Sequence, residues 1–403
     1  TATPADLPSK PEDRQRIFLQ IGQILGDQKS FDFDINLLLD EALNKYEPLT
    51  VMENIEYDKA ILMKIKSSQW PGFNLSIENV RDYATTGSGM DTLSHLLGFM
   101  GRVDQADMAS APGEYSLTDQ IGKSGLELFY EKTLRGSTGR ERIEVDALGK
   151  KKKVLARESA VNGQDLILSI NSELQGKLTE LLTDALKSAR LKKGAAVLLD
   201  PRNGEILASI SLPTYNDNLF ARGINKADYE LLIEDENLPL FNRVVSGEYP
   251  SGSTFKPIVA AGALEEGLIS RNTTINSVGG LKVNQWFFPD WKAGGHGYTN
   301  VTKALAWSVN TFFYIVGGGF QNFKGMGISK LIRYAKEFGL GAPLGVDLVG
   351  ERGGFLPSPE WKEDVKTNAG ILATLITWPL ARGICWSHLY SWRWPPRRLP
   401  TTA

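Results

Sequence analysis

The sequence predicts an α+β fold in two domains, over residues 1–164 and 165–368, followed by a tail of different character over residues 369–403. Three observations favour this organisation. The chain has 403 residues, of which 42% are hydrophobic and 23% are charged, and this is enough to bury two cores of ordinary size. Apolar residues recur at helical spacing in some segments and form short strand-like runs in others. After residue 368 the composition changes abruptly.

The first domain contains one well-patterned helix and one strand-like region. Residues 117–134 repeat apolar side chains at helical spacing and stop before Arg135 and Gly136, which predicts a packing helix. Residues 140–161 are charged and strand-like. The basic run Lys150–Lys153 within them is interpreted as a solvated turn rather than a binding patch.

The second domain is predicted to alternate strands and helices. Residues 165–170 form an apolar run that predicts a strand, and residues 172–189 follow as an amphipathic helix with a polar cap. Residues 194–200 and 205–211 are apolar runs on either side of a Pro-Arg-Asn-Gly turn, so they predict an antiparallel hairpin. Residues 253–264 have the apolar spacing of a buried helix whose first turn carries Ser253.

Composition excludes several classes of function. The formal net charge is −2 and no long basic block occurs, so a nucleic-acid partner is not expected. The single cysteine, Cys385, cannot form an internal disulfide, and the three histidines show no zinc-finger spacing. No run approaches the ~18 apolar residues of a membrane span. Because the first residue is Thr1 rather than Met, we expect the natural start to lie upstream.

Ser253 and Lys256 are the strongest candidates for chemistry. A serine hydroxyl is a weak nucleophile until a neighbouring base takes its proton, and residues three apart on a helix share a face. Free N–H groups at the start of the helix could also stabilise an oxyanion. This is the only Ser-x-x-Lys in the chain, and it follows the turn-forming residues Gly247, Pro250 and Gly252. The setting favours catalysis over an accidental helix start.

A second candidate element is Ser308-Val309-Asn310. It offers a hydroxyl and an amide, which could relay a proton and hold a peptide substrate. The same Ser-x-Asn pattern occurs at residues 169–171 and 270–272, so the pattern is not specific by itself. Only the copy at 308 has neighbours that fit an active site.

Longer stretches give these motifs their context. YPSGSTFKP, at residues 249–257, resembles the active-serine segment of class B penicillin-binding proteins, in particular those of the elongation branch. Ser-x-x-Lys, a Ser-x-Asn type element and Lys-Thr-Gly are the signature set of such acyl-serine enzymes. Further stretches that resemble the family are GAAVLLDPRNGEILA (194–208), NVTKALAWSVNTFFY (300–314), GVDLVGERGGFLP (345–357) and SHLLG (94–98).

This resemblance implies a peptidoglycan D,D-transpeptidase that cross-links stem peptides, with penicillins and other β-lactams acylating the same serine. It implies that Ser253 is the nucleophile and Lys256 its base, with Ser308 as proton relay and Asn310 holding the substrate amide. The implied fold is an amino-terminal pedestal domain followed by a penicillin-binding transpeptidase domain, an antiparallel sheet flanked by helices. No cofactor is expected.

The resemblance also implies a location and partners. We expect the outer face of the cytoplasmic membrane in a bacterial cell envelope, an anchor upstream of Thr1, and contacts with other cell-wall elongation proteins. Two alternatives remain. A serine β-lactamase or penicillin sensor would keep Ser253 and Lys256, but the long amino-terminal region disfavours it. A non-catalytic scaffold that binds cell-wall assembly partners is the other alternative.

The chain departs from the family pattern near its carboxyl end. Lys-Thr-Gly is absent: Lys366 and Thr367 are followed by Asn368, and they come too early for the strand that should carry the motif. Residues 369–403 are rich in tryptophan and arginine and contain no acidic residue. Codons can be chosen so that this tail, read one nucleotide out of phase, resembles the family's normal continuation, which favours a frameshift. We therefore expect an incomplete transpeptidase domain with little activity, whereas the intact parent protein is active.

Asp290 and His296 resemble two members of a zinc site found in some proteins of this family. The positions expected to supply another carboxylate and a cysteine carry Ser277 and Val309, so a loop hydrogen bond is favoured and no metal is expected. Four aromatic residues lie nearby: Trp286, Phe287, Phe288 and Trp291. They are expected to pack the loop down rather than to form a substrate wall.

Overall fold

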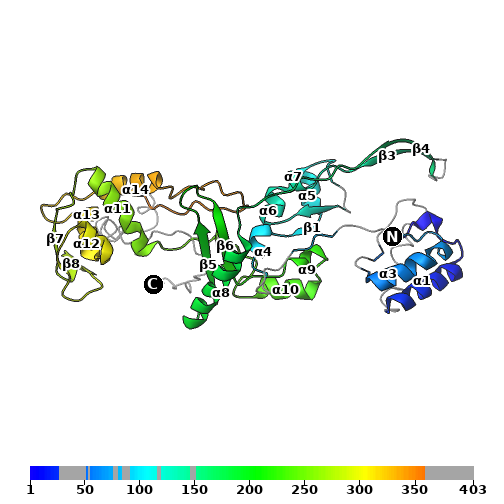
Figure 1. Ribbon diagram of the computed structural model, residues 1–403, viewed down its shortest axis with the longest axis horizontal. Helices are drawn as coiled ribbons and strands as arrows, with labels where there is room; N and C mark the ends of the chain where they lie inside the picture. Colours follow the sequence, from blue (N-terminus) through cyan, green and yellow to red (C-terminus); the bar gives the residue numbers. More distant parts are fainter. Residues whose placement is uncertain are drawn as a thin grey trace, which may run out of the picture.

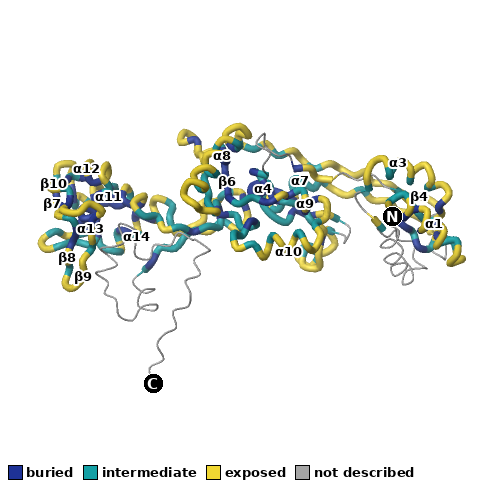
Figure 2. The backbone as a smooth tube through the Cα atoms, turned by 90° about the horizontal axis from the view of Figure 1, so that it is seen from below, coloured by how far each residue is buried: buried dark blue, intermediate teal, exposed yellow. Residues whose placement is uncertain are grey.

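The computed structural model describes residues 1–26, 51–52, 55–75, 80–83, 91–115, 119–145 and 151–358. Within them, helices alternate with two-stranded antiparallel sheets, which confirms the predicted α+β class. Figures 1 and 2 show the elements in three groups along the long axis, each with its own cluster of buried apolar side chains. The predicted tail, with Cys385, and the Lys366-Thr367 pair lie outside the described residues. The domain boundaries after 164 and 368 stay predictions.

The first group is a pair of helices. Its elements are α1 (Pro11–Leu25), α3 (Tyr57–Lys66) and the 3₁₀ turns η1 (Pro4–Asp6) and η2 (Ser67–Gln69). One face of α1 buries Ile17, Phe18 and Ile21 against Trp70. The Trp70 Nε1–H donates to Gln20 Oε1 at 2.9 Å, so the indole is satisfied at its polar edge as well.

The second group is built from short elements. The first of them are α4 (Ser94–Leu97), β1 (Met100–Arg102), α5 (Gln105–Ser110), β2 (Gln120–Gly122), α6 (Gly125–Phe129) and α7 (Glu131–Leu134). Strands β1 and β2 pair antiparallel. The helix predicted over residues 117–134 is therefore wrong in its first half. A Cβ at Gly122 would lie 2.1 Å from the carbonyl oxygen of Glu127, so β2 and α6 approach each other as only glycine allows.

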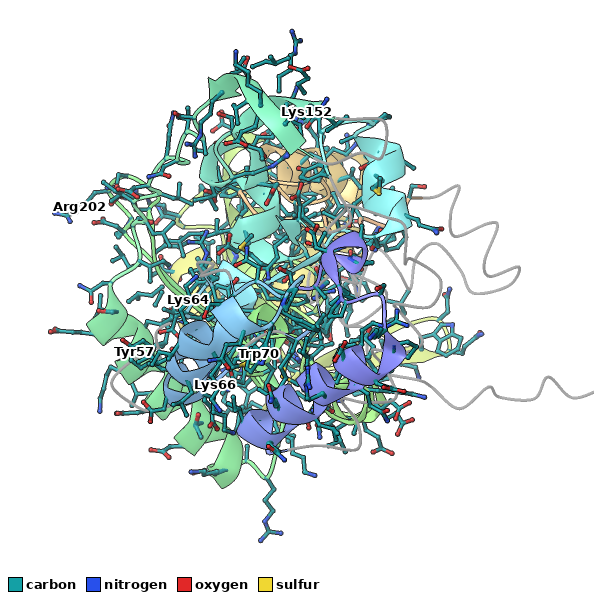
Figure 3. The ribbon with its side chains drawn as sticks, turned by 90° about the vertical axis from the view of Figure 1, so that its right-hand side faces the viewer. Tyr57, Lys64, Lys66, Trp70, Lys152 and Arg202 are labelled. Carbon is teal, nitrogen blue, oxygen red and sulfur yellow. The ribbon has the colours of Figure 1, made fainter. Side chains whose placement is uncertain are left out.

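A long hairpin of β3 (Arg140–Val145) and β4 (Lys151–Glu158) extends from the second group (Figure 1). The predicted strand-like region is confirmed. Lys151, Lys152 and Lys153 of the basic run, however, open β4 instead of forming a turn. Lys152 and Lys153 are exposed, and Lys152 lies at the periphery in Figure 3, so the solvated character expected for this run holds for both side chains.

The helix and hairpin predicted at the start of the second domain are confirmed. Helix α8 (Ser172–Ser188) begins after Asn171, whose Oδ1 accepts two backbone N–H groups at 3.0 Å, a cap worth about 1 kcal/mol. Strands β5 (Gly194–Leu199) and β6 (Ile206–Leu212) pair antiparallel, and α8 packs on them. Two short helices follow: α9 (Asn218–Ala221) and α10 (Lys226–Glu234).

The strand predicted over residues 165–170 is not a strand. The segment alternates as a strand would, since Ile167 is 94% exposed while three neighbours pack on the core of the second group: Leu166, Leu168 and Ile170. It forms no ladder in the described part of the chain. Instead, the Ser169 hydroxyl donates to the carbonyl of Ile206 at 2.8 Å, so a side chain provides the contact to β6.

The third group holds the helix predicted from Ser253 onward. It opens with the 3₁₀ turn η3 (Gly252–Phe255) and α11 (Lys256–Glu265), and its other helices are α12 (Val301–Ala306), α13 (Asn310–Gly318) and α14 (Gly327–Glu337). Two antiparallel pairs lie beside them: β7 (Ile275–Ser277) with β10 (Gly297–Thr299), and β8 (Gly280–Val283) with β9 (Trp286–Pro289). Phe255, Phe312 and Phe313 form the centre of its core, at most 1% exposed.

Candidate active site

Ser253 and Lys256 lie on successive turns at the start of this buried helix. Ser253 belongs to η3 and is exposed, whereas Lys256 opens α11 and is only 1% exposed. Pro257 is accommodated because the first residues of a helix have N–H groups without helical partners. The local structure thus places a hydroxyl at the surface and a cation beneath it. A cation buried in this way needs polar partners.

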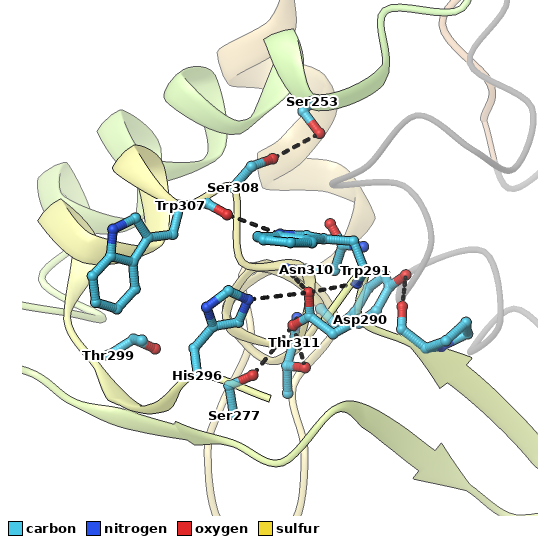
Figure 4. A network of polar contacts seen from close by, with 12 residues as sticks. Ser253, Ser277, Asp290, Trp291, His296, Thr299, Trp307, Ser308, Asn310 and Thr311 are labelled. Carbon is cyan, nitrogen blue, oxygen red and sulfur yellow. Dashed lines mark hydrogen bonds and ion pairs between the residues drawn. The ribbon is translucent and has the colours of Figure 1, made fainter. Parts of the chain in front are cut away.

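The partners of Lys256 come from the Ser308-Val309-Asn310 motif. Lys256 Nζ donates to the carbonyl oxygen of Ser308, to Ser308 Oγ and to Asn310 Oδ1, each at 2.8 Å. Ser308 Oγ in turn donates to Ser253 Oγ at 3.0 Å, as Figure 4 shows. The structure therefore brings together all four residues singled out in the sequence, and Ser308 joins Ser253 to Lys256.

The turn between α12 and α13 presents Ser308 to the other residues. Ser308 has a φ of 53°, in the left-handed region that side chains with a Cβ seldom occupy. Its N–H donates to the Leu305 carbonyl at 3.2 Å, and the Val309 N–H donates to the Ala304 carbonyl at 2.9 Å. These two backbone hydrogen bonds fix the turn at Ser308 and at the residue after it. Asn310 then opens α13 and is 3% exposed.

A cavity of about 480 Å³ opens beside these residues. It is lined by Ser253, Trp291, Ala306, Trp307, Ser308 and Asn310. Ser253 and Ser308, which is hydrogen-bonded to it, therefore face a space large enough for a peptide segment. This is where a reacting carbonyl can meet a serine with a base in reach.

Trp291 contradicts the expectation that the loop aromatics only pack the loop down. It is 61% exposed, it lines the cavity, and its Nε1–H donates to the Trp307 carbonyl at 2.9 Å. Trp286 and Phe287 are also exposed, and only Phe288 packs against the core. Trp307 also lines the cavity and was not predicted from the sequence, although its position directly before Ser308 could have indicated it.

Asp290 forms hydrogen bonds within the loop, as predicted, but among these residues its partner is Ser277 and not His296. Ser277 Oγ donates to Asp290 Oδ2 at 3.2 Å, and His296 Nε2 lies 4.0 Å from Asp290 Oδ1. Val309 offers an alkyl side chain where the resemblance implies a thiolate, so the donor set does not fit zinc. Within the described residues, no cluster of three or more His, Cys, Asp or Glu side chains is placed to hold a metal ion.

A second cavity, of about 840 Å³, lies in the second group of elements. Two of its charged lining residues are paired: Arg81 Nε lies 2.7 Å from Glu127 Oε1, and Tyr83 donates its hydroxyl to the same carboxylate at 3.4 Å. These contacts connect the segment that contains Arg81 and Tyr83 to α6, which contains Glu127. The smaller cavity beside Ser253 is the candidate active site, because it is the one lined by Ser253, Ser308 and Asn310.

Comparison with known proteins connects both halves of the chain to one family. Residues 1–168 match the penicillin-binding protein dimerisation domain, and residues 194–378 match the penicillin-binding protein transpeptidase domain. Fold and site together thus define a two-domain protein with a serine-centred cleft. The chain belongs to the penicillin-binding proteins.

Several of its relatives within that family are named peptidoglycan D,D-transpeptidases. MrdA of Haemophilus influenzae is 33% identical over 371 residues, which cover 89% of this chain and 53% of the relative. MrdA of Escherichia coli is 35% identical over 327 residues, covering 79% and 49%. The chain spans about half the length of the curated relatives it matches. PBP2 of Helicobacter pylori, solved in complex with MreC, is 28% identical with a TM-score of 0.78, covering 95% of this chain and 68% of that one.

Proposed function

We propose that the chain is a serine-type D,D-transpeptidase that cross-links peptidoglycan stem peptides and is acylated by penicillins. The observation that carries this proposal is the run of hydrogen bonds from buried Lys256 through Ser308 to exposed Ser253, at the wall of a cavity. This arrangement gives a weak nucleophile a base within reach. The activity named for the relatives supports the choice of substrate.

In the proposed acylation step, Ser253 Oγ attacks the carbonyl carbon of a donor stem peptide. Lys256 must first lose one proton, so that the hydrogen bonds among Lys256, Ser308 and Ser253 reverse their direction. A C–O bond then forms and the peptide C–N bond breaks, while the proton of Ser253 passes through Ser308 Oγ to the neutral amine of Lys256 and then to the departing amine. The amine of a second stem peptide then takes the acyl group, and Ser253 regains its proton. In a penicillin the broken C–N bond lies in the lactam ring, so the amine stays attached and the adduct persists.

Asn310 supports a role in holding the substrate. Its Oδ1 accepts from Lys256, whereas its buried Nδ2 has no hydrogen-bond partner in the part of the chain that the structure describes. A buried donor without a partner is uncommon in a native protein. A substrate carbonyl entering the adjacent cavity would satisfy it.

We also propose that the protein works at the outer face of the cytoplasmic membrane, together with other cell-wall proteins. The support comes from its neighbours: PBP2 of Helicobacter pylori was solved with MreC, and another neighbour, 28% identical over 88% of this chain, comes from a peptidoglycan synthase complex. None of the helices described is both long and apolar enough to cross a bilayer.

A fluorescent penicillin tests the catalytic proposal directly. The full chain should acquire one label on the peptide that contains Ser253, and Ser253→Ala should acquire none. Ser251→Ala is the matched control, because it removes a hydroxyl two residues away that has no partner among the described residues. This control should label like the original chain.

Three outcomes would overturn the proposal: labelling of Ser253→Ala, labelling elsewhere in the chain, or rapid turnover of a chromogenic β-lactam, which favours a hydrolase. Transfer of the acyl group from a labelled stem-peptide donor to an amine acceptor then tests cross-linking. The rate of labelling also tests the expectation that the chain, without a Lys-Thr-Gly motif, reacts slowly.

A further inference from the structure

Asp290 lies beneath the start of α13 and is bound there by five hydrogen bonds. Its side chain is fully buried. Oδ1 accepts the N–H groups of Trp291 at 2.9 Å and Asn310 at 3.2 Å. Oδ2 accepts the Thr311 N–H at 2.9 Å, the Thr311 hydroxyl at 2.7 Å and the Ser277 hydroxyl at 3.2 Å (Figure 4).

The Asp290 carboxylate caps the amino-terminal end of α13, although it is distant from that helix in the sequence. The first residues of a helix have N–H groups without helical partners, and a side chain at the N-cap usually accepts one or two of them. The N-cap of α13 is Val309, which has no side-chain acceptor. Asp290, 20 residues upstream, accepts the N–H groups of Asn310 and Thr311 instead. Its negative charge also suits the positive end of the helix.

Asn310 is held from two sides in consequence. Its backbone N–H is fixed by Asp290, and its side-chain Oδ1 accepts from Lys256 at 2.8 Å. Lys256 in turn contacts Ser308, which donates to Ser253. Only one residue therefore separates the buried carboxylate from the base, and the two charges act on opposite ends of Asn310.

We propose that Asp290 is a positioning residue for the acylation of Ser253: it sets the start of α13, and through Asn310 and Ser308 it holds Lys256 in line with the nucleophile. This inference rests on the proposed transpeptidase function. The state of the carboxyl agrees with it. Burial raises the pKa of Asp290, but the hydrogen bonds from Thr311, Asn310 and Trp291 outweigh burial, so the pKa lies below its ordinary value and the group stays ionised.

The test compares Asp290→Asn with Asp104→Asn in the full chain. Asp104 is a matched control because its carboxylate also accepts two N–H groups at the start of a helix, α5, outside the cleft. Amide hydrogen exchange should rise about 10- to 100-fold at Asn310 and Thr311 in Asp290→Asn, because hydrogen bonds to a charged acceptor are lost there. Exchange at residues 315–318, further along α13, should stay as in the original chain.

Acylation by a penicillin gives the second measurement. In Asp290→Asn, the rate constant of the covalent step should fall about 10- to 100-fold, while the penicillin concentration for half-saturation stays within twofold. In Asp104→Asn, the rate constant should stay within twofold of the original. Thr311→Val, which removes one donor to Asp290, should shift both measurements the same way by a smaller factor. This second variant keeps the test valid if Asp290→Asn folds poorly.

The outcomes separate this inference from the proposed function. Unchanged exchange at residues 310 and 311, or faster exchange throughout α11 and α13, would overturn the positioning role, because the second result indicates a general loss of packing. An unchanged covalent rate constant in a folded Asp290→Asn would overturn it as well. If the original chain does not react with penicillin, the proposed function fails, and the exchange pattern alone decides whether Asp290 sets the start of α13.

Discussion

At the scale of the residue, the site is organised around the buried Lys256. An ammonium group has three donors, and three acceptors lie 2.8 Å from Lys256 Nζ. One of them, Ser308 Oγ, also contacts Ser253, so it is the atom through which a proton can move. Spacing in the sequence predicted that Ser253 and Lys256 share a face. It could not predict the contact with Ser308, which lies 52 residues further on and depends on packing of α11 against α13.

Lys256→Arg separates the charge of this residue from its capacity to act as a base. Arginine keeps the positive charge but does not give up its proton at any ordinary pH, and its planar group fits the site poorly. We expect the rate of Ser253 acylation to fall by about 10²- to 10⁴-fold, the usual contribution of a general base. The rate constant of labelling by a fluorescent penicillin measures this. Labelling at the original rate would show that Lys256 contributes only its charge.

At the scale of the element, sequence patterns predicted the secondary structure correctly where local features of the segment determine it. Helix α8 was predicted correctly because its periodicity and its cap, Asn171, agree. Residues 165–170 have the alternation of a strand, but a strand also needs a neighbour with free backbone groups. Residues 117–134 have helical spacing, but Gly122 allows a closer contact between β2 and α6 than a helix would. In both cases tertiary packing overrode the local pattern.

Glu266 ties the end of α11 to α14 and gives a prediction at this scale. Hydrogen bonds from Lys330 and then from Arg333 lower the pKa of its carboxyl to about 2, below the ordinary 4.5. A depressed pKa contributes stability that is present above the unfolded value and is lost as the pH falls towards the folded one. Glu266→Gln should therefore lower the Tm at pH 7, and the difference from the original chain should shrink between pH 4.5 and 2.

The measurement is thermal unfolding at several pH values and salt concentrations. Added salt should reduce the difference, because the cations are partly exposed. Glu265→Gln is the matched control, since Glu265 is the exposed neighbour of Glu266. An equal loss of Tm in both variants, or a difference that does not depend on pH, would contradict the prediction.

At the scale of the whole molecule, the three groups of elements have separate cores, and the candidate site lies within one of them (Figure 1). The α+β class and the four candidate residues could be predicted because the motifs mark them. The role inferred for Asp290 could not be, because its partners come from β7 and α13, and no spacing relates them. The resemblance implied an antiparallel sheet flanked by helices, yet among the described residues β5 pairs only with β6, its partner in the predicted hairpin.

The outer edge of β5 makes a prediction about association. Val197, Leu198 and Leu199 are 44%, 36% and 53% exposed, and an exposed apolar strand edge favours pairing with another chain. Val197→Lys should reduce concentration-dependent association, measured by light scattering or sedimentation. Leu231→Lys in α10 is the matched control, because Leu231 is 71% exposed outside any strand. An equal effect of both substitutions would show that the strand edge is not responsible.

The left-handed backbone of Ser308 limits which amino acids this position accepts. A φ of 53° is costly for a β-branched side chain, whereas serine tolerates it and glycine adopts it freely. Threonine has the same hydroxyl, yet it would oppose the turn, and glycine would fit the turn but carry no hydroxyl. The backbone conformation therefore excludes threonine, and the need for a hydroxyl excludes glycine. Of these three amino acids, only serine has the hydroxyl and also tolerates the left-handed backbone. A protein that needs both the proton relay and this turn therefore cannot replace Ser308 by threonine or by glycine.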